Sequence, residues 1–325
     1  MRAMLIQAGE RLLADCPPGW VADLLAEACP GQWKPPDGRA DIELSVTRNQ
    51  APFRHVGAEP LTRGAYRRDR TVVLINACGS GFDLAMEAAE DQLRVAARWR
   101  PPSRERLAAR VLRSRFHLLA RAALVQYPAL WWAGRRGRVP LHAAAVTVGD
   151  AVPLLAGPGG IGRSTLLLDA VAAGERACSD NLCVSDGERV YGLVEPVRVE
   201  GGGGRRMAYG RRERELPGQL AALRPDRLVV LSRGSAGEAA LRPASAATAA
   251  ETLTAGTYMA GELRRYWAFA ATLAMGTGIG RAHPAIREVA GALATRLPAW
   301  EIVLGATPGP GLAELLMTGP SVVTP

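Results

Sequence analysis

The chain of 325 residues is long enough for two modest domains, and its 48% hydrophobic content is sufficient to bury a core. No stretch approaches the roughly 20 uncharged apolar residues of a membrane-spanning helix, and Glu10, Arg11 and Asp15 argue against a signal peptide, so we expect a cytoplasmic protein without a membrane partner. The net charge of +9 accompanies a strong preference for arginine (Lys34 is the only lysine) and just 5% aromatic residues, which indicates a compositional bias and disfavours a nucleic-acid-binding surface.

Residues 1–100 are predicted to form a small α+β region of unknown role. Its expected elements are an amphipathic segment at 5–28, a Pro/Gly-rich break at 29–38, strands at 41–46 and 71–76, and a helix at 82–98. The run Arg-Pro-Pro-Ser at 100–103 predicts a stop, followed by a long helix towards residue 126 with Ser103 as its N-cap. We therefore place a domain boundary near Pro101, with the second domain at 101–325.

The second domain is predicted to alternate strands and helices, which makes the fold class α/β (α+β). The expected strands lie at 140–148, 151–156, before residue 180, 182–184, 190–194, 227–231 and 300–304. The expected helices lie at 164–173, 258–274 and 284–296, with a flexible break at 201–204 and an arginine-dense segment at 205–215. Five cysteines without C-x-x-C spacing are expected to be buried small hydrophobes. The Trp131–Trp132 and Tyr266–Trp267 pairs are expected in a core or at a domain interface or, alternatively, in a peptide-binding groove.

A glycine-rich segment follows the second of these strands and opens a helix. Its spacing is G-x-x-x-x-G-[K]-S with arginine in the lysine position: Gly157, Pro158, Gly159, Gly160, Ile161, Gly162, Arg163, Ser164 and Thr165. Glycines allow consecutive backbone N–H groups to wrap phosphate oxygens, and the helix N-terminus favours negative charge. A glycine-rich turn without chemical function is the alternative, but the strand before and the helix after favour a nucleotide-binding loop.

The chain resembles the HPr kinase/phosphorylases and related kinases, including those encoded with modified-peptide genes. The resemblance rests on LHAAAVTVGDAVPLLAGPGGIGRSTLLLDAVAAGERACSDNLCV at 141–184, in which His142, the glycine-rich loop and Asp180 match the family's spacing. It is weaker through 195–198 and is not detected before residue 100. It implies a P-loop core of that type, and self-association would be compatible with it because related kinases are often oligomers.

The resemblance also implies roles for individual residues. Residues 157–165 would bind the phosphates of ATP, and Asp180 would orient or deprotonate an attacking hydroxyl. His142 would lie at the edge of the site. Ser164, Asp180 and Asn181 would be the candidate ligands of Mg²⁺. The alternatives are a helix or turn cap for Asp180 and an ordinary strand histidine for His142. Arg198, in the Glu-Pro-Val-Arg segment, is a weaker candidate for substrate binding, and the arginine-dense segment after it reads more simply as a solvated loop.

Two departures from the family pattern bear on catalysis. Arginine replaces lysine at 163, and Asn181 replaces the second of two aspartates. We therefore carry two hypotheses: an ATP-dependent kinase acting on a Ser/Thr hydroxyl of a peptide, protein or small molecule, and a non-catalytic scaffold that binds a nucleotide, a peptide or a protein partner of a biosynthetic complex. A P-loop ATPase or GTPase switch is disfavoured because no guanine-specificity motif and no clear catalytic glutamate are found.

Overall fold

The computed structural model describes residues 1–325 except 202, 208–209, 235–238, 306–308 and 319–325. Helices and strands both make up large parts of the chain, so the predicted mixed α/β (α+β) class is confirmed. Within the described ranges, no helix combines the length and apolar character needed to cross a bilayer. The predicted flexible break and arginine-dense segment include residues 202 and 208–209, which lie outside the described residues.

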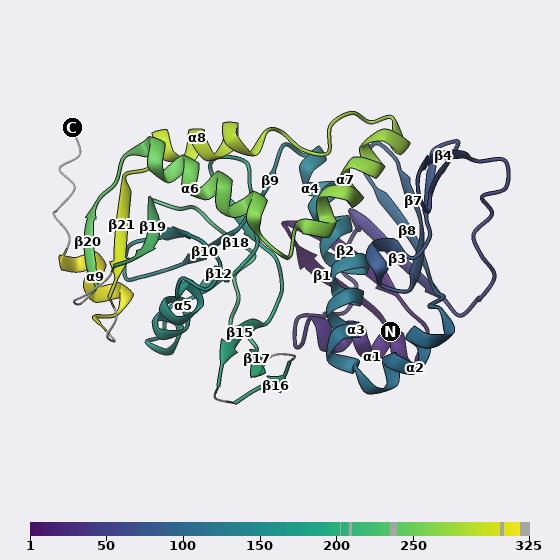
Figure 1. The fold of residues 1–325 in the computed structure, drawn as a ribbon, viewed down its shortest axis with the longest axis horizontal. Helices are drawn as coiled ribbons and strands as arrows, with labels where there is room; N and C mark the ends of the chain where they lie inside the picture. Colours follow the sequence, from purple (N-terminus) through teal and green to yellow (C-terminus); the bar gives the residue numbers. More distant parts are fainter. Residues whose placement is uncertain (202, 208–209, 235–238, 306–308, 319–325) are drawn as a thin grey trace.

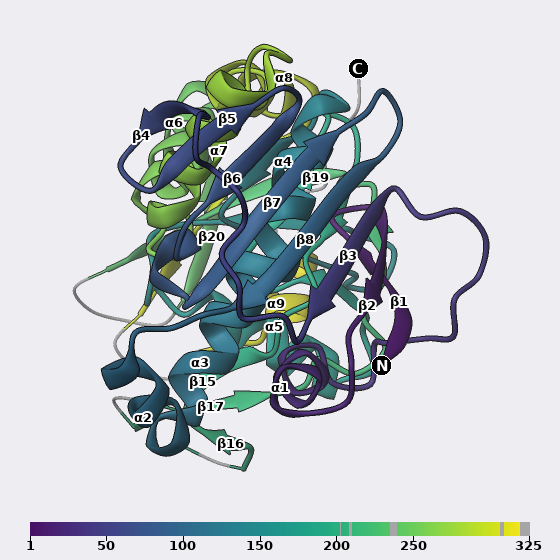
Figure 2. The same ribbon diagram turned by 90° about the vertical axis from the view of Figure 1, so that its right-hand side faces the viewer.

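The first hundred residues form an eight-stranded sheet, which Figure 2 shows face-on. Its strand order is β1-β2-β3-β8-β7-β6-β5-β4. The elements are β1 (Arg2–Gln7), β2 (Glu10–Asp15), α1 (Trp20–Ala28), β3 (Ile42–Thr47), β4 (Glu59–Thr62), β5 (Ala65–Arg68), β6 (Thr71–Leu74), a 3₁₀ turn (Ala77–Gly79), β7 (Phe82–Ala88) and β8 (Leu93–Trp99). The strands predicted at 41–46 and 71–76 are confirmed, while the amphipathic segment at 5–28 divides into parts of two strands and a helix.

The helix predicted at 82–98 is wrong. This segment is the antiparallel hairpin β7–β8, in which Leu84 lies opposite Ala97 and Met86 opposite Val95. Side chains along β8 alternate between buried and more exposed positions, with the period of two that is typical of a strand. Alanine and glutamate are favourable in helices, but pairing with β3 and β6 decides the conformation of this segment.

The segment after the sheet is helical but interrupted. It comprises α2 (Ser103–Val111), α3 (Arg113–Ala120), a π-helical stretch (Arg121–Gln126) and α4 (Tyr127–Arg135). The single helix predicted from Ser103 to residue 126 is wrong, because Leu112 leaves the helical conformation with φ −102° and ψ 47°. The predicted cap is also wrong, since Ser103 is already in the first turn and no side chain caps α2.

The core of the N-terminal sheet also contains later parts of the chain. Helices α3 and α4 and helix α7 (Arg264–Thr277) contribute buried side chains to it, including Trp131, Trp132 and Tyr266. These aromatic residues are therefore core residues, as predicted. Figure 1 shows α4 and α7 beside the N-terminal sheet. The boundary near Pro101 remains a prediction, and the structure adds that helices from both sides of it pack together.

A six-stranded sheet forms the centre of the other half of the molecule (Figure 1). Its order is β12-β10-β11-β19-β21-β20, and β11, β19 and β21 are mutually parallel. The strands are β10 (Ala143–Val146), β11 (Pro153–Ala156), β12 (Ala177–Ser179), β19 (Arg227–Arg233), β20 (Ala240–Pro243) and β21 (Ala299–Leu304). The strands predicted at 151–156, 227–231 and 300–304 are confirmed within two residues at each end.

Helices cover both faces of this sheet. Leu154 and Leu228 face α6 (Ala246–Met259) and α8 (Ile286–Arg296), whereas Leu155 and Val229 face α5 (Arg163–Ala172) and α9 (Leu312–Thr318). Ser245 caps α6 by accepting a hydrogen bond from the N–H of Thr248 at 3.0 Å. The single helix predicted at 258–274 is wrong, because α6 ends at Met259 and α7 begins after a turn that contains Gly261.

Two small sheets complete the fold. A four-stranded sheet has the order β18-β14-β13-β9, and a three-stranded sheet has the order β15-β17-β16. Their strands are β9 (Val139–Leu141), β13 (Cys183–Ser185), β14 (Val190–Gly192), β15 (Val197–Glu200), β16 (Arg205–Arg206), β17 (Arg211–Arg214) and β18 (Ala222–Leu223). The hairpin predicted around 182–194 is therefore present as β13–β14, and the five cysteines are free thiols of which all but Cys78 are buried.

Candidate functional site

Two segments of the chain connect the four-stranded and six-stranded sheets side by side, in opposite chain directions. The strand predicted at 140–148 is divided at His142, which lies between β9 and β10. Asp180 and Asn181 lie between β12 and β13, which pair with β10 and β9 respectively. Because both connections occur at the same place, His142 and Asp180 are brought to one site although 38 positions separate their numbers.

The glycine loop, residues 157–162, joins β11 to α5 at the edge of the six-stranded sheet where His142 and Asp180 lie. Gly160 and Gly162 have φ of +78° and +115°, values that residues with a Cβ rarely adopt. Within the described residues, no backbone N–H from Gly159 to Thr165 donates a hydrogen bond to the protein. Together with the N-terminus of α5, this loop presents donors that an anion could accept.

A cleft of about 1020 Å³ opens above the loop. All residues predicted for the site line this cleft except Gly157 and Ile161. The predicted residues that line it are His142, Pro158, Gly159, Gly160, Gly162, Arg163, Ser164, Thr165, Asp180, Asn181 and Arg198. The two exceptions support the loop from below. Ile161 is buried in the core under α5, and a Cβ on Gly157 would lie 3.1 Å from the carbonyl oxygen of Leu231.

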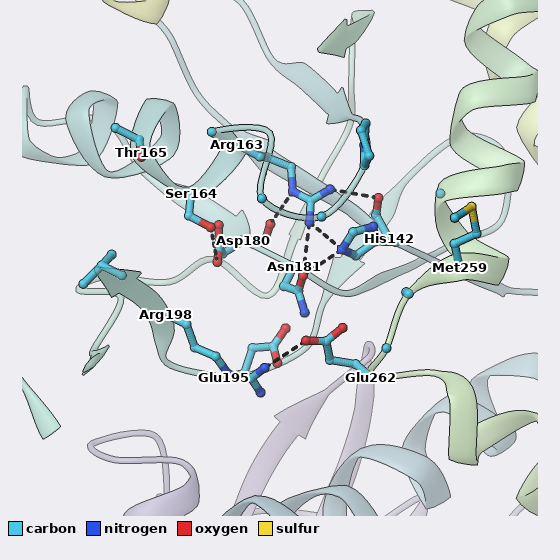
Figure 3. A pocket seen from close by; sticks show the side chains of 18 of the residues that line it. His142, Arg163, Ser164, Thr165, Asp180, Asn181, Glu195, Arg198, Met259 and Glu262 are labelled. Carbon is cyan, nitrogen blue, oxygen red and sulfur yellow. Dashed lines mark hydrogen bonds and ion pairs between the residues drawn. The ribbon is translucent and has the colours of Figure 1, made fainter. Parts of the chain in front are cut away.

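Arg163 begins α5, and its side chain points into the protein (Figure 3). It is 6% exposed, and its guanidinium donates to three backbone carbonyl oxygens: that of Asp180 at 3.1 Å, that of His142 at 3.2 Å and that of Gly157 at 3.3 Å. It also donates to the Asn181 side chain at 3.1 Å. Burial lowers the pKa of Arg163, and nearby Asp180 opposes this effect. The side chain therefore joins the glycine loop to both connections between the two sheets, the one at His142 and the one at Asp180 and Asn181.

His142 receives another hydrogen bond from the same guanidinium. Its Nε2 lies 2.7 Å from Nη2 of Arg163 and 2.9 Å from Oδ1 of Asn181. A guanidinium only donates, so Nε2 accepts from Arg163 and the imidazole carries its proton on Nδ1. Oδ1 of Asn181 is also an acceptor, so in this tautomer it lies beside Nε2 without a hydrogen bond to it. Burial, helped by the charge of Arg163, lowers the pKa of His142 to about 4. His142 is therefore a neutral acceptor at neutral pH.

Ser164 and Asp180 face each other on the open side of the loop (Figure 3). The Ser164 hydroxyl donates to Oδ2 of Asp180 at 3.0 Å. The other carboxylate oxygen, Oδ1, is buried and has no hydrogen-bond partner in the described part of the chain. Burial raises the pKa of Asp180, whereas Ser164 and Arg163 lower it. A buried carboxylate oxygen with no partner is costly, so it marks a position for a donor or a cation from a ligand.

Three further charged groups line the cleft near Asp180. Arg198 on β15 donates to Oε1 of Glu262 at 2.8 Å, which links the three-stranded sheet to the turn between α6 and α7. Glu195 is 5% exposed and accepts from the N–H of Leu182 at 3.1 Å. The sequence prediction found Arg198 but missed both glutamates. Glu195 could have been noticed in the Glu-Pro-Val-Arg segment, whereas no local pattern distinguishes Glu262.

The oxygen donors at the site suit a Mg²⁺ ion that is also bound by phosphate. Within the described ranges, no group of three or more His, Cys, Asp or Glu side chains could enclose a metal ion. Mg²⁺ beside phosphates commonly takes one or two protein ligands and completes its shell with water and phosphate oxygens. Ser164 Oγ and Asp180 fit that requirement. Asn181 fits less well, because its oxygen already accepts from the Arg163 cation.

Comparison with known proteins does not assign the chain. No protein-family model matches the sequence, and no curated protein matches it.

Proposed function

We propose that the chain is an HPr-kinase-like, ATP-dependent phosphotransferase that acts on a Ser/Thr hydroxyl of a peptide, protein or small molecule. The observation that carries the proposal is the pairing of Ser164 with buried Asp180. Among the described residues, Oδ1 of Asp180 and the backbone N–H groups of the neighbouring glycine loop have no hydrogen-bond partner. The loop donors would bind the phosphates of ATP, and Ser164 and Asp180 would hold Mg²⁺, which supplies neutralisation of the phosphate charge.

Asp180 has the position and environment of a proton acceptor. As the acceptor hydroxyl oxygen bonds to the γ-phosphorus, the bond from that phosphorus to the bridging oxygen breaks, and ADP leaves. The hydroxyl proton passes to Oδ1 of Asp180. Burial raises the pKa of this carboxyl above that of an exposed aspartate, whereas a Mg²⁺ ion held at the same carboxylate would lower it, so its strength as a base would depend on both.

One observation favours the second candidate, a non-catalytic nucleotide-binding or peptide-binding scaffold. The guanidinium of Arg163, although the residue lines the cleft, is committed to hydrogen bonds with three carbonyl oxygens of the protein. A loop residue that contacts the phosphates of the substrate stabilises charge in the transition state, and Arg163 would not supply that contribution. Nucleotide binding without turnover would follow.

The two candidates can be separated with Mg-ATP. We would measure its binding by calorimetry, and follow phosphoryl transfer from labelled ATP to water and to an array of Ser- and Thr-containing peptides. The kinase predicts binding and transfer, with transfer reduced about a thousandfold or more in Asp180→Asn. The matched control is Asp169→Asn, because Asp169 is an exposed aspartate of α5 that lines the same cleft.

Each outcome supports or excludes a stated interpretation. Binding without any transfer by the wild-type protein would favour the scaffold. Full transfer by Asp180→Asn would refute the assigned role of Asp180. If Mg-ATP does not bind to the wild-type protein, both the kinase and the nucleotide-binding scaffold are wrong.

A further inference from the structure

The orientation of Arg163 leaves the phosphate side of the cleft without the cation that its position in the loop would supply. Five arginines line the cleft: Arg163, Arg198, Arg211, Arg214 and Arg233. Three of them are engaged within the protein. Arg163 contacts the two connections between the sheets, Arg198 pairs with Glu262, and Arg214 donates to the carbonyl oxygen of Gly203 at 3.2 Å. The remaining two, Arg211 and Arg233, have side chains with no hydrogen bond or ion pair to another residue in the part of the chain that the structure describes.

Arg233 lies beside the glycine loop. It is the last residue of β19, the parallel neighbour of β11, in which Val230 pairs with Ala156. Parallel strands end at the same sheet edge, so the residues after Val230 run alongside the loop. The close approach of Gly157 to the Leu231 carbonyl confirms this arrangement. Arg233 is exposed and lines the cleft.

Arg211 lies elsewhere in the cleft. It is on β17 of the three-stranded sheet, which reaches the cleft through β15 and does not adjoin β11. Both arginines are exposed, so neither would lose an existing partner on meeting a ligand. They differ in the element that presents them, and only Arg233 shares its sheet edge with the loop donors.

We propose that Arg233 binds the phosphates of the ligand, as a cation presented by the strand next to the glycine loop. A guanidinium presents parallel N–H donors that match two phosphate oxygens, and the contact is charge-assisted. Arg163 would then maintain the shape of the loop while Arg233 contacts the ligand. This inference rests on the proposed function, because it assumes a phosphate ligand in this cleft.

The test compares three matched variants, Arg233→Gln, Arg211→Gln and Arg224→Gln. Arg224 is exposed, precedes β19 at its other end and does not line the cleft. Calorimetry would use Mg-ATP and, separately, inorganic tripolyphosphate, which lacks the nucleoside. We expect Arg233→Gln to weaken both ligands about ten- to a hundredfold, Arg224→Gln to change them less than about twofold, and Arg233→Lys to recover part of the loss.

The outcomes distinguish this inference from the proposed function. If the wild-type protein binds neither ligand, the nucleotide proposal fails and the role of Arg233 falls with it. If the wild-type protein binds and Arg233→Gln binds as tightly as Arg224→Gln, only the role of Arg233 is overturned. A loss of affinity in Arg211→Gln alone would also overturn the role of Arg233, because it would assign the phosphate contact to β17. Equal melting temperatures of the variants would show that the loss is not caused by unfolding.

Discussion

Nη2 of Arg163 lies 2.7 Å from Nε2 of His142, so a permanently charged arginine donates to a buried histidine. The contact can form only while the imidazole is neutral, because a protonated Nε2 would itself be a donor. His142 is 4% exposed, and burial together with the Arg163 charge lowers its pKa from 6.5 to about 4. The pair therefore makes the packing around the glycine loop dependent on pH.

The first prediction is a loss of stability in mild acid. Between pH 6.5 and about 4, the unfolded chain protonates His142 while the folded chain does not, so the unfolded state binds more protons. The free energy of unfolding should therefore fall as the pH is lowered through this window, by about 2 kcal/mol from this residue between pH 7 and pH 5. Urea unfolding at the two pH values measures it.

His142→Gln provides the control for that experiment. Glutamine can accept from Arg163 but does not titrate, so the variant should lose this part of the pH dependence. His283, whose pKa is also lowered by burial, remains in both proteins and contributes equally to both. An unchanged difference between pH 7 and pH 5 in His142→Gln would contradict the prediction.

The second prediction concerns Arg163 itself. Arg163→Met should destabilise the protein by about 3 kcal/mol, because the carbonyl oxygens of Gly157, His142 and Asp180 lose buried donors. Arg163→Lys should cost about 1–2 kcal/mol, since an ammonium on a single stem cannot reach all the acceptors of the guanidinium fork. Denaturant unfolding at neutral pH measures both variants.

The same pair of variants tests whether lysine improves the site. If Arg163 has only a structural role, Arg163→Lys gains no affinity for Mg-ATP. A variant with lysine that is as stable as the wild type and binds Mg-ATP more tightly would show instead that residue 163 faces the ligand.

Local sequence patterns were sufficient to find the strand, glycine loop and helix around residues 151–173. The positive φ at residues 160 and 162 favours glycine, so the loop is visible in the sequence, and the apolar residues on each side indicate a strand and a helix from neighbouring positions alone. Asp180 and His142 were found because the spacing of a resembling family indicated them. The division of residues 140–148 between two sheets was not predicted, because strand pairing is decided by partners far along the chain.

The rest of the site depends on contacts that no local pattern records. Glu262 reaches the cleft because α6 and α7 meet at a turn, and its partner Arg198 comes from a different sheet. The direction of the Arg163 side chain likewise cannot be predicted from the residue type alone. That direction is decided by the carbonyl oxygens of residues 142 and 180, which only the connections between the two sheets place within reach.

The third prediction compares two glycines of the loop. Gly162→Ala should destabilise the protein by roughly 1–2 kcal/mol, because its φ of +115° is strained for alanine and the new Cβ would lie 3.1 Å from Leu304. Gly159→Ala should change stability by less than about 1 kcal/mol, since no atom lies within 4 Å of a Cβ there. Melting temperatures of the two variants measure this, and equal losses would refute the assigned conformations.

The fourth prediction concerns Glu213, which ties the three-stranded sheet to the helices after the N-terminal sheet. Oε2 of Glu213 accepts from Nε2 of His117 at 2.8 Å, and Oε1 accepts from Arg121 at 3.5 Å. All three side chains are buried. Burial opposes the charge of Glu213, but His117, Arg121 and Arg198 together lower its pKa, so it remains a carboxylate.

Removing this carboxylate leaves Arg121 buried without its counter-ion. Glu213→Ala should therefore destabilise the protein by about 3 kcal/mol, whereas Glu215→Ala, at an exposed position two residues later, should cost less than about 0.5 kcal/mol. Because β17 pairs with β15, hydrogen exchange of Val197–Glu200 should accelerate more than that of β11 or β19. Equal acceleration throughout the chain would mean that Glu213 stabilises the whole fold and does not anchor the three-stranded sheet in particular.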